Sequence, residues 1–277
     1  MIYLFLAMLS SMMVSVFMRM SERYSRGGMG MLATNYLMCC GLSIAFSGSI
    51  QLFPAMDGRS AALFMGVVNG VLYLAGFVLL QWNISKNGVV LPATFMKLGV
   101  LVPTILSILA FGEIPGAAQI IGILAAIIAI LLIQGGGKQE TRSAGGLALL
   151  LLAGGGGDAM SKVFEEIGPA ALKDHFLLYT FLTALILCIV LAFVKKQPFS
   201  WREAIWGLMI GIPNYFSARF LLLSLKDVPA VAAYPSYSVG TIVLVTLVGV
   251  LCFKEKLSRR KRIALGVILV SLALLNL

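Results

Sequence analysis

Charged side chains are scarce in this chain of 277 residues. Only 12% of the residues are charged, and 11 acids stand against 21 lysines and arginines. The chain has a single histidine, His175. Enzymes that use acid–base or metal chemistry gather several such groups at one place. We therefore predict neither an enzyme, such as a membrane enzyme acting on lipids, nor a metal or cofactor site.

Cysteine is also rare, and no nucleotide-binding motif is present. The four cysteines lie in apolar stretches without the paired spacing of zinc ligands, at Cys39, Cys40, Cys188 and Cys252. We expect all four to be buried free thiols. The chain lacks a Walker-type phosphate loop, so ATP hydrolysis is not expected.

Apolar residues are what the chain has in abundance. They make up 60% of it, and the mean hydropathy is +1.00. A soluble domain of this length could not bury so much apolar surface, so lipid must be the solvent. The formal charge of +10 comes from basic residues in short loops between apolar runs. That placement favours contact with membrane lipid and gives no support for a nucleic-acid partner.

The apolar runs predict ten transmembrane helices. A helix needs about 20 residues to cross roughly 30 Å of hydrocarbon. On that basis the candidate spans are about 1–19, 30–50, 61–81, 88–111, 115–134, 144–163, 175–194, 202–225, 229–252 and 260–276. Glycines at helical spacing, as in Gly66/Gly70 and Gly207/Gly211, should allow close helix contacts.

The positions of lysine and arginine predict the orientation in the membrane. The loops after the odd-numbered spans hold 15 of them, and the other loops hold only Arg59, Lys162, Lys173 and Lys226. By the positive-inside rule, the odd-numbered loops are cytoplasmic and both termini lie outside. The expected location is the bacterial cytoplasmic membrane.

The chain also repeats itself. Phe111-Gly112-Glu113 recurs 142 residues later as Phe253-Lys254-Glu255, each time where one apolar span ends. The same offset places Tyr73 on Tyr215. We predict two five-span repeats, 1–137 and 138–277. Because five is odd, the two repeats must cross the membrane in opposite senses, as in many transporters.

A span followed by Phe-x-Glu and another span, used twice, resembles the EamA-type branch of the drug/metabolite transporter superfamily. The resemblance covers almost the whole chain. It implies an all-α membrane fold with a central cavity, lined chiefly by spans three, four, eight and nine. It also implies a small-molecule substrate, often exported, and outer fifth and tenth spans that serve scaffold or homodimer contacts. One departure is the basic first loop with an N-terminus free of basic side chains, where the family usually has the reverse.

Three ionisable residues lie inside predicted spans, where charge is costly and indicates function. They are Lys97, Asp158 and Arg219. At 1.5 Å per residue, Lys97 lies roughly 13 Å from its end of the membrane, while Asp158 and Arg219 lie roughly 8 and 9 Å from the opposite face. Asp158 and Arg219 could therefore form an ion pair or take part in proton coupling. Lys97 has no acid at its depth and could bind backbone carbonyls freed by a nearby proline, bind a substrate anion, or exchange protons.

Polar and aromatic side chains accompany these charges at depths where lipid does not favour them. Tyr73 and Tyr215 are repeat mates and suit two walls of one pocket. Ordinary helix packing is the alternative for each tyrosine. The substrate-binding candidates are Lys97, Arg219, Tyr73, Tyr215, Asn69, Asn214, Tyr234, Tyr237 and Asn35.

Glu113 and Glu255 end spans four and nine. They could couple protons, but a glutamate at a span boundary favours a structural role. Glu113 should accept hydrogen bonds from the amides that begin span five.

These observations together predict a secondary active transporter, proton-coupled or an exchanger, for a small polar metabolite. Lys97 and Arg219 favour an amino acid or organic anion over a cationic drug. The small multidrug members of the superfamily need an acid in mid-span one, and here that stretch is Met12 to Val16. A flippase for lipids or other amphipathic molecules is the alternative, since it could share the fold.

Overall fold

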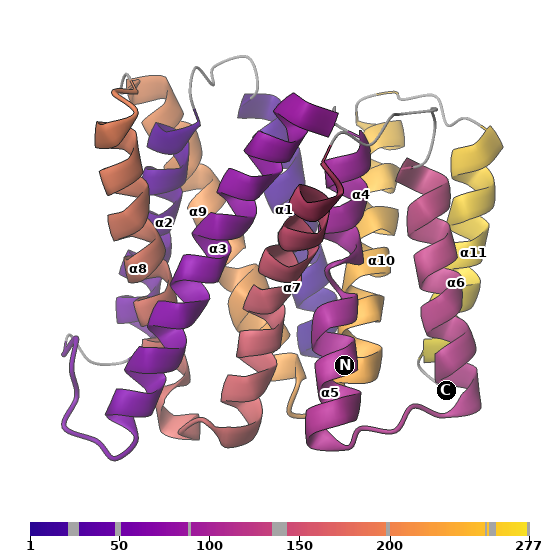
Figure 1. The fold of residues 1–277 in the computed structure, drawn as a ribbon, viewed down its shortest axis with the longest axis horizontal. Helices are drawn as coiled ribbons and strands as arrows, with labels where there is room; N and C mark the ends of the chain where they lie inside the picture. The colour runs from indigo at the N-terminus through magenta and orange to yellow at the C-terminus, as the bar shows by residue number, and fades with distance from the viewer. Residues whose placement is uncertain are drawn as a thin grey trace. The chain divides into compact units, whose positions relative to one another are not determined.

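The protein is all α-helical in the computed structural model, which describes residues 1–21, 28–47, 51–87, 90–134, 143–197, 200–252, 254 and 259–275. Figure 1 shows the order of the helices. They are α1 (Ile2–Ser21), α2 (Met29–Ser47), α3 (Arg59–Asn87), α4 (Val90–Leu98), α5 (Leu101–Phe111), α6 (Ala117–Gln134), α7 (Ala144–Ile167), the 3-10 helix η2 (Ala170–Leu172), α8 (Lys173–Val194), α9 (Trp201–Ser224), α10 (Ala230–Leu251) and α11 (Arg259–Leu275).

These helices match the ten predicted spans, because α4 and α5 together occupy the range of the fourth. Within the described ranges, six helical segments are long and apolar enough to cross a membrane, and three shorter apolar helices accompany them. Large apolar side chains point outward, including Leu109 and Phe193, which are 80% and 79% exposed. Such surfaces suit a lipid solvent, and the chain is a multi-pass membrane protein.

The helices group into two compact units. Unit 1 comprises Met1, residues 75–162 and residues 224–277, and unit 2 comprises residues 2–74 and 163–223. Each unit holds helices from both predicted repeats, and α3 and α7 continue from one unit into the other. The boundary of the sequence repeats at residue 137 stays a prediction.

The middle residue of the repeat motif has a positive φ in both copies. Gly112 ends α5 with φ 66°, and Lys254, its repeat mate, has φ 54°. A left-handed residue at a helix end is the common way to stop a helix, and glycine adopts it without strain. The flanking Phe253 and Glu255 lie outside the described residues.

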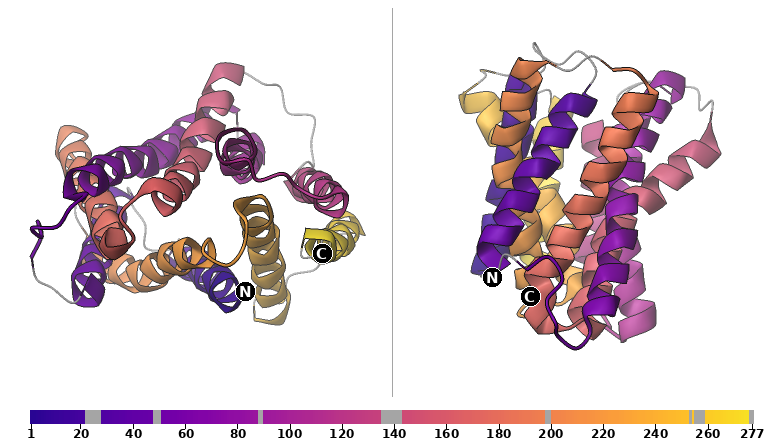
Figure 2. Two further views of the ribbon diagram at one scale, coloured as in Figure 1. Left: turned by 90° about the horizontal axis from the view of Figure 1, so that it is seen from below. Right: turned by 90° about the vertical axis from the view of Figure 1, so that its left-hand side faces the viewer.

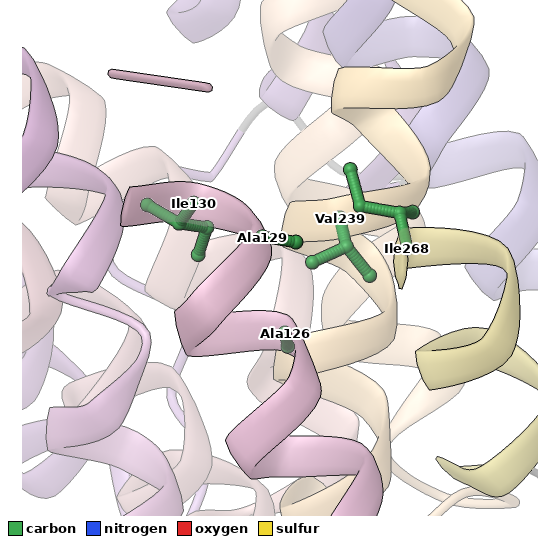
Figure 3. Close-up of a cluster of buried hydrophobic side chains, with 5 residues drawn as sticks. All are labelled: Ala126, Ala129, Ile130, Val239 and Ile268. Carbon is green, nitrogen blue, oxygen red and sulfur yellow. The ribbon is translucent and has the colours of Figure 1, made fainter. Parts of the chain in front are cut away.

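Unit 1 is organised around α6, α10 and α11. α6 runs beside α11, in contact with it (Figures 1 and 2). A buried cluster joins the three helices through Ala126, Ala129, Ile130, Val239 and Ile268 (Figure 3). The Ser271 hydroxyl also donates to the Gly122 carbonyl across α6 and α11, at 2.7 Å. The fifth and tenth spans therefore pack on each other.

Unit 2 is organised around α8, which packs along α2 (Figure 1). Glycines make the close approaches. A Cβ atom added at Gly70 would lie 2.5 Å from the Thr180 carbonyl oxygen of α8, and one at Gly207 would lie 2.2 Å from the Met31 carbonyl oxygen of α2. The predicted glycine contacts are confirmed, because only a hydrogen side chain leaves room for the neighbouring backbone.

Candidate functional site

The fourth predicted span is broken in the middle. Pro103 has no amide hydrogen to donate to the carbonyl of Gly99, four residues earlier. That carbonyl accepts instead from Val102 at 2.9 Å, which tightens the chain into a turn between α4 and α5. Discontinuous helices expose helix ends at depth, and in transporters they often form substrate sites.

The break lies against α7. A Cβ atom at Gly155 would lie 2.0 Å from the Gly99 carbonyl oxygen, so the two backbones touch. The run of glycines at 154–157 is what permits this contact. It brings neighbouring residues of α4 and α7 to one depth.

Two ionisable residues lie beside this contact. Lys97 precedes Gly99 by two residues, and Asp158 follows Gly155 by three. Both side chains are partly buried, and the two charges lie within electrostatic range of each other. The expectation that Lys97 has no acid at its depth is wrong. α7 extends to Ile167, four residues beyond the predicted end of the span, so Asp158 lies deeper than predicted.

α10 contributes a tyrosine to the same place. The Tyr234 hydroxyl donates to the backbone carbonyl of Asp158 at 2.6 Å, and its ring is fully buried. The next helical turn carries Tyr237, which is partly buried and has contacts of its own. Lys97, Asp158 and Tyr234 thus form the candidate site of unit 1.

Glu113 has a different partner from the one predicted. Its carboxylate accepts from the Val231 amide at the start of α10, at 3.0 Å, and forms an ion pair with Lys162 at 2.7 Å. The amide of Gly116, just before α6, is satisfied by the Gln119 side chain. Pro229, which precedes α10, makes no side-chain cap, so the free amide there is the one that Glu113 meets. Lys162, predicted in a loop, is buried within α7.

Unit 2 holds the third charge. Arg219 on α9 forms an ion pair with Asp174, in the first turn of α8, and donates to the Tyr215 hydroxyl at 2.7 Å. The guanidinium carbon lies 4.7 Å from the centre of the Phe46 ring, a cation–π contact. Sequence reasoning missed Asp174 because the seventh span was predicted to begin at residue 175. The acid paired with Arg219 is therefore Asp174, not the Asp158 that the depth estimates matched to it.

The asparagine candidates of unit 2 join helices to one another. The Asn214 amide donates to the Asn35 side-chain oxygen at 3.2 Å, between α9 and α2. The Asn69 amide donates to the Thr180 hydroxyl at 3.3 Å, while its own side-chain oxygen is buried without a hydrogen-bond partner. Interhelical bonds of this kind stabilise packing in a membrane.

The two tyrosines expected as pocket walls both contact Phe181. Tyr73 meets this ring edge-on at 6.0 Å between centroids, and Tyr215 meets it tilted at 6.4 Å. Tyr215 is fully buried. Each of the repeat mates therefore packs against the same aromatic ring of α8.

The cysteine prediction holds in part. Cys39, Cys40 and Cys188 are buried free thiols, but Cys252 is exposed because it lies just beyond the end of α10. In the part of the chain that the structure describes, no cluster of His, Cys, Asp and Glu could hold a metal ion.

Comparison with known proteins decides the family. Residues 144–277 match the model of the EamA-like transporter family. These residues, the second half of the chain, belong to this family. An uncharacterized protein of Haemophilus influenzae is 23% identical over 268 residues, covering 92% of this chain and 91% of the relative. A crystal structure of a protein with 15% identity has the same fold, with a TM-score of 0.76 over 99% of this chain and 94% of that one.

The family match gives the functional class of this EamA-like protein. It is a membrane transporter and does not belong to an enzyme family. The matched residues correspond to the second predicted repeat. A transporter acts on a small molecule, and the side chains at the break of the fourth span are the best candidates to meet it.

Proposed function

We propose that this EamA-like protein is a secondary active transporter of a small carboxylate-bearing metabolite, an amino acid or another organic anion. The observation that carries the proposal is the position of Lys97 and Asp158 beside the break between α4 and α5. A cation and an acid at this depth are costly in a membrane and are typical of substrate or proton pathways.

The chemistry of the site favours a carboxylate. The Lys97 ammonium can bind it as a point charge, and the N-terminal end of α5 adds the partial positive charge of the helix dipole. No side chain caps that end. Asp158 is placed to accept the ammonium group of a zwitterion. An amino acid therefore meets a complementary charge at each end.

Alternate binding of substrate and proton at one site would also explain how transport is driven. A substrate or a proton can occupy the Lys97–Asp158 pair, so each displaces the other during a cycle. The inverted repeats 1–137 and 138–277 would supply the two access states. Arg219 is engaged by Asp174 and Tyr215, so we assign it a role in ordering unit 2 rather than in holding substrate.

A ligand screen on the purified protein tests the proposal. Amino acids, organic anions and organic cations are compared by the rise in thermal unfolding temperature that each produces. A ligand at 100 times its Kd stabilises by about 2.7 kcal/mol, which in a chain of this size raises the unfolding temperature by several degrees. We expect this rise for a carboxylate and its loss in Lys97→Gln, with no loss in the control Lys86→Gln, an exposed lysine of α3.

Asp158 gives the second arm of this experiment. Asp158→Asn should weaken binding of amino acids more than binding of simple organic acids, because only the former carry an ammonium group. The proposal fails if Lys97→Gln leaves both the ligand response and transport into vesicles unchanged. It also fails if cations are the ligands that stabilise the protein.

We also propose that the odd-numbered loops face the cytoplasm of a bacterial cell. Cysteines introduced one at a time at Ser143 and Ser200, in a Cys252→Ser background that leaves only buried thiols, report this directly. A membrane-impermeant thiol reagent should not label them in intact cells and should do so after lysis. Labelling in intact cells would reverse the orientation.

A further inference from the structure

A large apolar cavity lies within unit 2, and none of the charged residues described above lines it. Its volume is about 820 Å³, and α2, α8 and α9 form its walls. Its lining is almost entirely apolar and includes Ala33, Leu37, Ile189, Phe193 and Leu208. The Thr34 hydroxyl, which also lines it, donates to backbone carbonyls of its own helix. These walls would not recognise a small polar metabolite.

The length of the cavity matches one leaflet of a membrane. Along α8 its lining extends from Leu185 to Phe193, a rise of about 12 Å at 1.5 Å per residue, and it continues past the helix end to Lys196. The hydrocarbon core of a bilayer is roughly 30 Å thick, so the cavity spans about half of it. An acyl chain that enters from the membrane surface would have this length.

Apart from Thr34, whose hydroxyl bonds within its own helix, the polar side chains of the lining lie at one end of the cavity. Lys196, Gln197 and Trp201 line it there, just beyond the end of α8 and at the start of α9. Lysine and tryptophan are the residues that meet lipid headgroups at a membrane surface. Lys195 and Arg202 adjoin this end and add positive charge.

Lys196 holds an unusual backbone conformation. Its φ is 48°, and the next amide, that of Gln197, donates back to the Ala192 carbonyl at 3.1 Å. This is a helix ending in which glycine is the usual residue. A lysine in this conformation carries backbone strain of roughly 1 kcal/mol. The chain thus has a lysine side chain at the polar end of the cavity, at a position where the backbone favours glycine.

We infer that this cavity binds one anionic phospholipid of the adjacent leaflet. An acyl chain lies along α8, and the headgroup phosphate accepts hydrogen bonds from the Lys196 ammonium. Trp201, 76% exposed, packs at the level of the headgroup. The predicted orientation places this end at the cytoplasmic face, where anionic lipid attracts basic residues. The inference does not depend on which metabolite is transported.

Photolabelling in vesicles tests the site. The probes are phosphatidylglycerol and phosphatidylcholine, each with a diazirine in its acyl chain, and mass spectrometry locates the labelled peptides. We expect phosphatidylglycerol to label the cavity walls in preference. Lys196→Gln should lower this labelling about tenfold or more, as loss of a charge-assisted hydrogen bond would. Ala33→Phe, which fills the cavity, should abolish it.

Lys195→Gln is the matched control. It removes the same charge one residue away, from a side chain that does not line the cavity. If Lys195 only attracts anionic lipid to the membrane surface, Lys195→Gln should lower phosphatidylglycerol labelling by no more than about fivefold. Equal losses in Lys195→Gln and Lys196→Gln would overturn the inference, as would equal labelling by the two lipids.

The oligomeric state shows whether a lipid or a second copy of the chain occupies the cavity. Native mass spectrometry of each variant reports both lipid adducts and the number of chains. If Ala33→Phe converts a dimer to a monomer and leaves lipid labelling unchanged, a protein surface covers the cavity and the inference is wrong. If Ala33→Phe does not fold, the comparison of Lys195→Gln with Lys196→Gln decides the matter alone.

Discussion

The ion pair between Glu113 and Lys162 makes a sharp test of how unit 1 is held together. The side chains are 15% and 2% exposed, so water screens this pair weakly. Removing one partner of a buried pair costs about 3–5 kcal/mol, because a buried charge loses its counter-charge. Glu113→Gln isolates that effect, since the amide oxygen of glutamine can still accept from the Val231 amide.

The expected change is large enough to measure by thermal unfolding in detergent. At about 2–4 °C per kcal/mol for a chain of this size, Glu113→Gln should lower the unfolding temperature by roughly 6–20 °C. Glu113→Ala should lower it further, by the additional cost of losing a helix-capping acceptor, about 0.5–2 kcal/mol. The double variant Glu113→Gln/Lys162→Met should recover most of the loss, because it removes the buried charge as well.

Glu166→Gln is the matched control, an exposed acid one helical turn from Lys162 on α7. Its effect should stay below about 1 kcal/mol. Detergent, lipid and protein concentration must be held constant across the variants, since each shifts the apparent stability. If Glu113→Gln lowers the unfolding temperature no more than Glu166→Gln does, the structural role argued for Glu113 is refuted.

Two further predictions concern packing and charge in each unit. Gly155→Ala should abolish the monodisperse peak in size-exclusion chromatography, because its methyl group would meet backbone of α4, whereas Gly145→Ala, with open space around it, should leave the peak unchanged. Asp174→Asn should cost about 1–2 kcal/mol in thermal unfolding, less than for a fully buried pair because both side chains are partly exposed, and Asp174→Asn/Arg219→Gln should recover it. An additive result in that double-mutant cycle would mean that the pair does not couple.

Much of the fold was predictable because the lipid environment permits few kinds of secondary structure. Every backbone amide must be satisfied within its own segment, so each apolar run of sufficient length becomes a helix. The ten spans, the repeated motif and the close glycine contacts follow from local sequence on this basis. Span ends followed less closely from local sequence. α7 exceeds its predicted end by four residues, which places Asp158 at the depth of Lys97.

The partners of the buried charges were decided by tertiary structure. Lys97, Asp158, Arg219 and Glu113 were all found from the sequence, yet Arg219 pairs with Asp174 and Glu113 meets the first turn of α10, neither of which was predicted. A charged residue inside a membrane span can be recognised from the sequence, because the free-energy cost of burying it depends only on the residue and its depth. Its partner depends on which helices are neighbours and how they are rotated, and that emerges only when the helices pack. The duplicated Phe-x-Glu motif therefore predicts the repeat, while the packing of α5, α7 and α10 decides what the glutamate of its first copy binds.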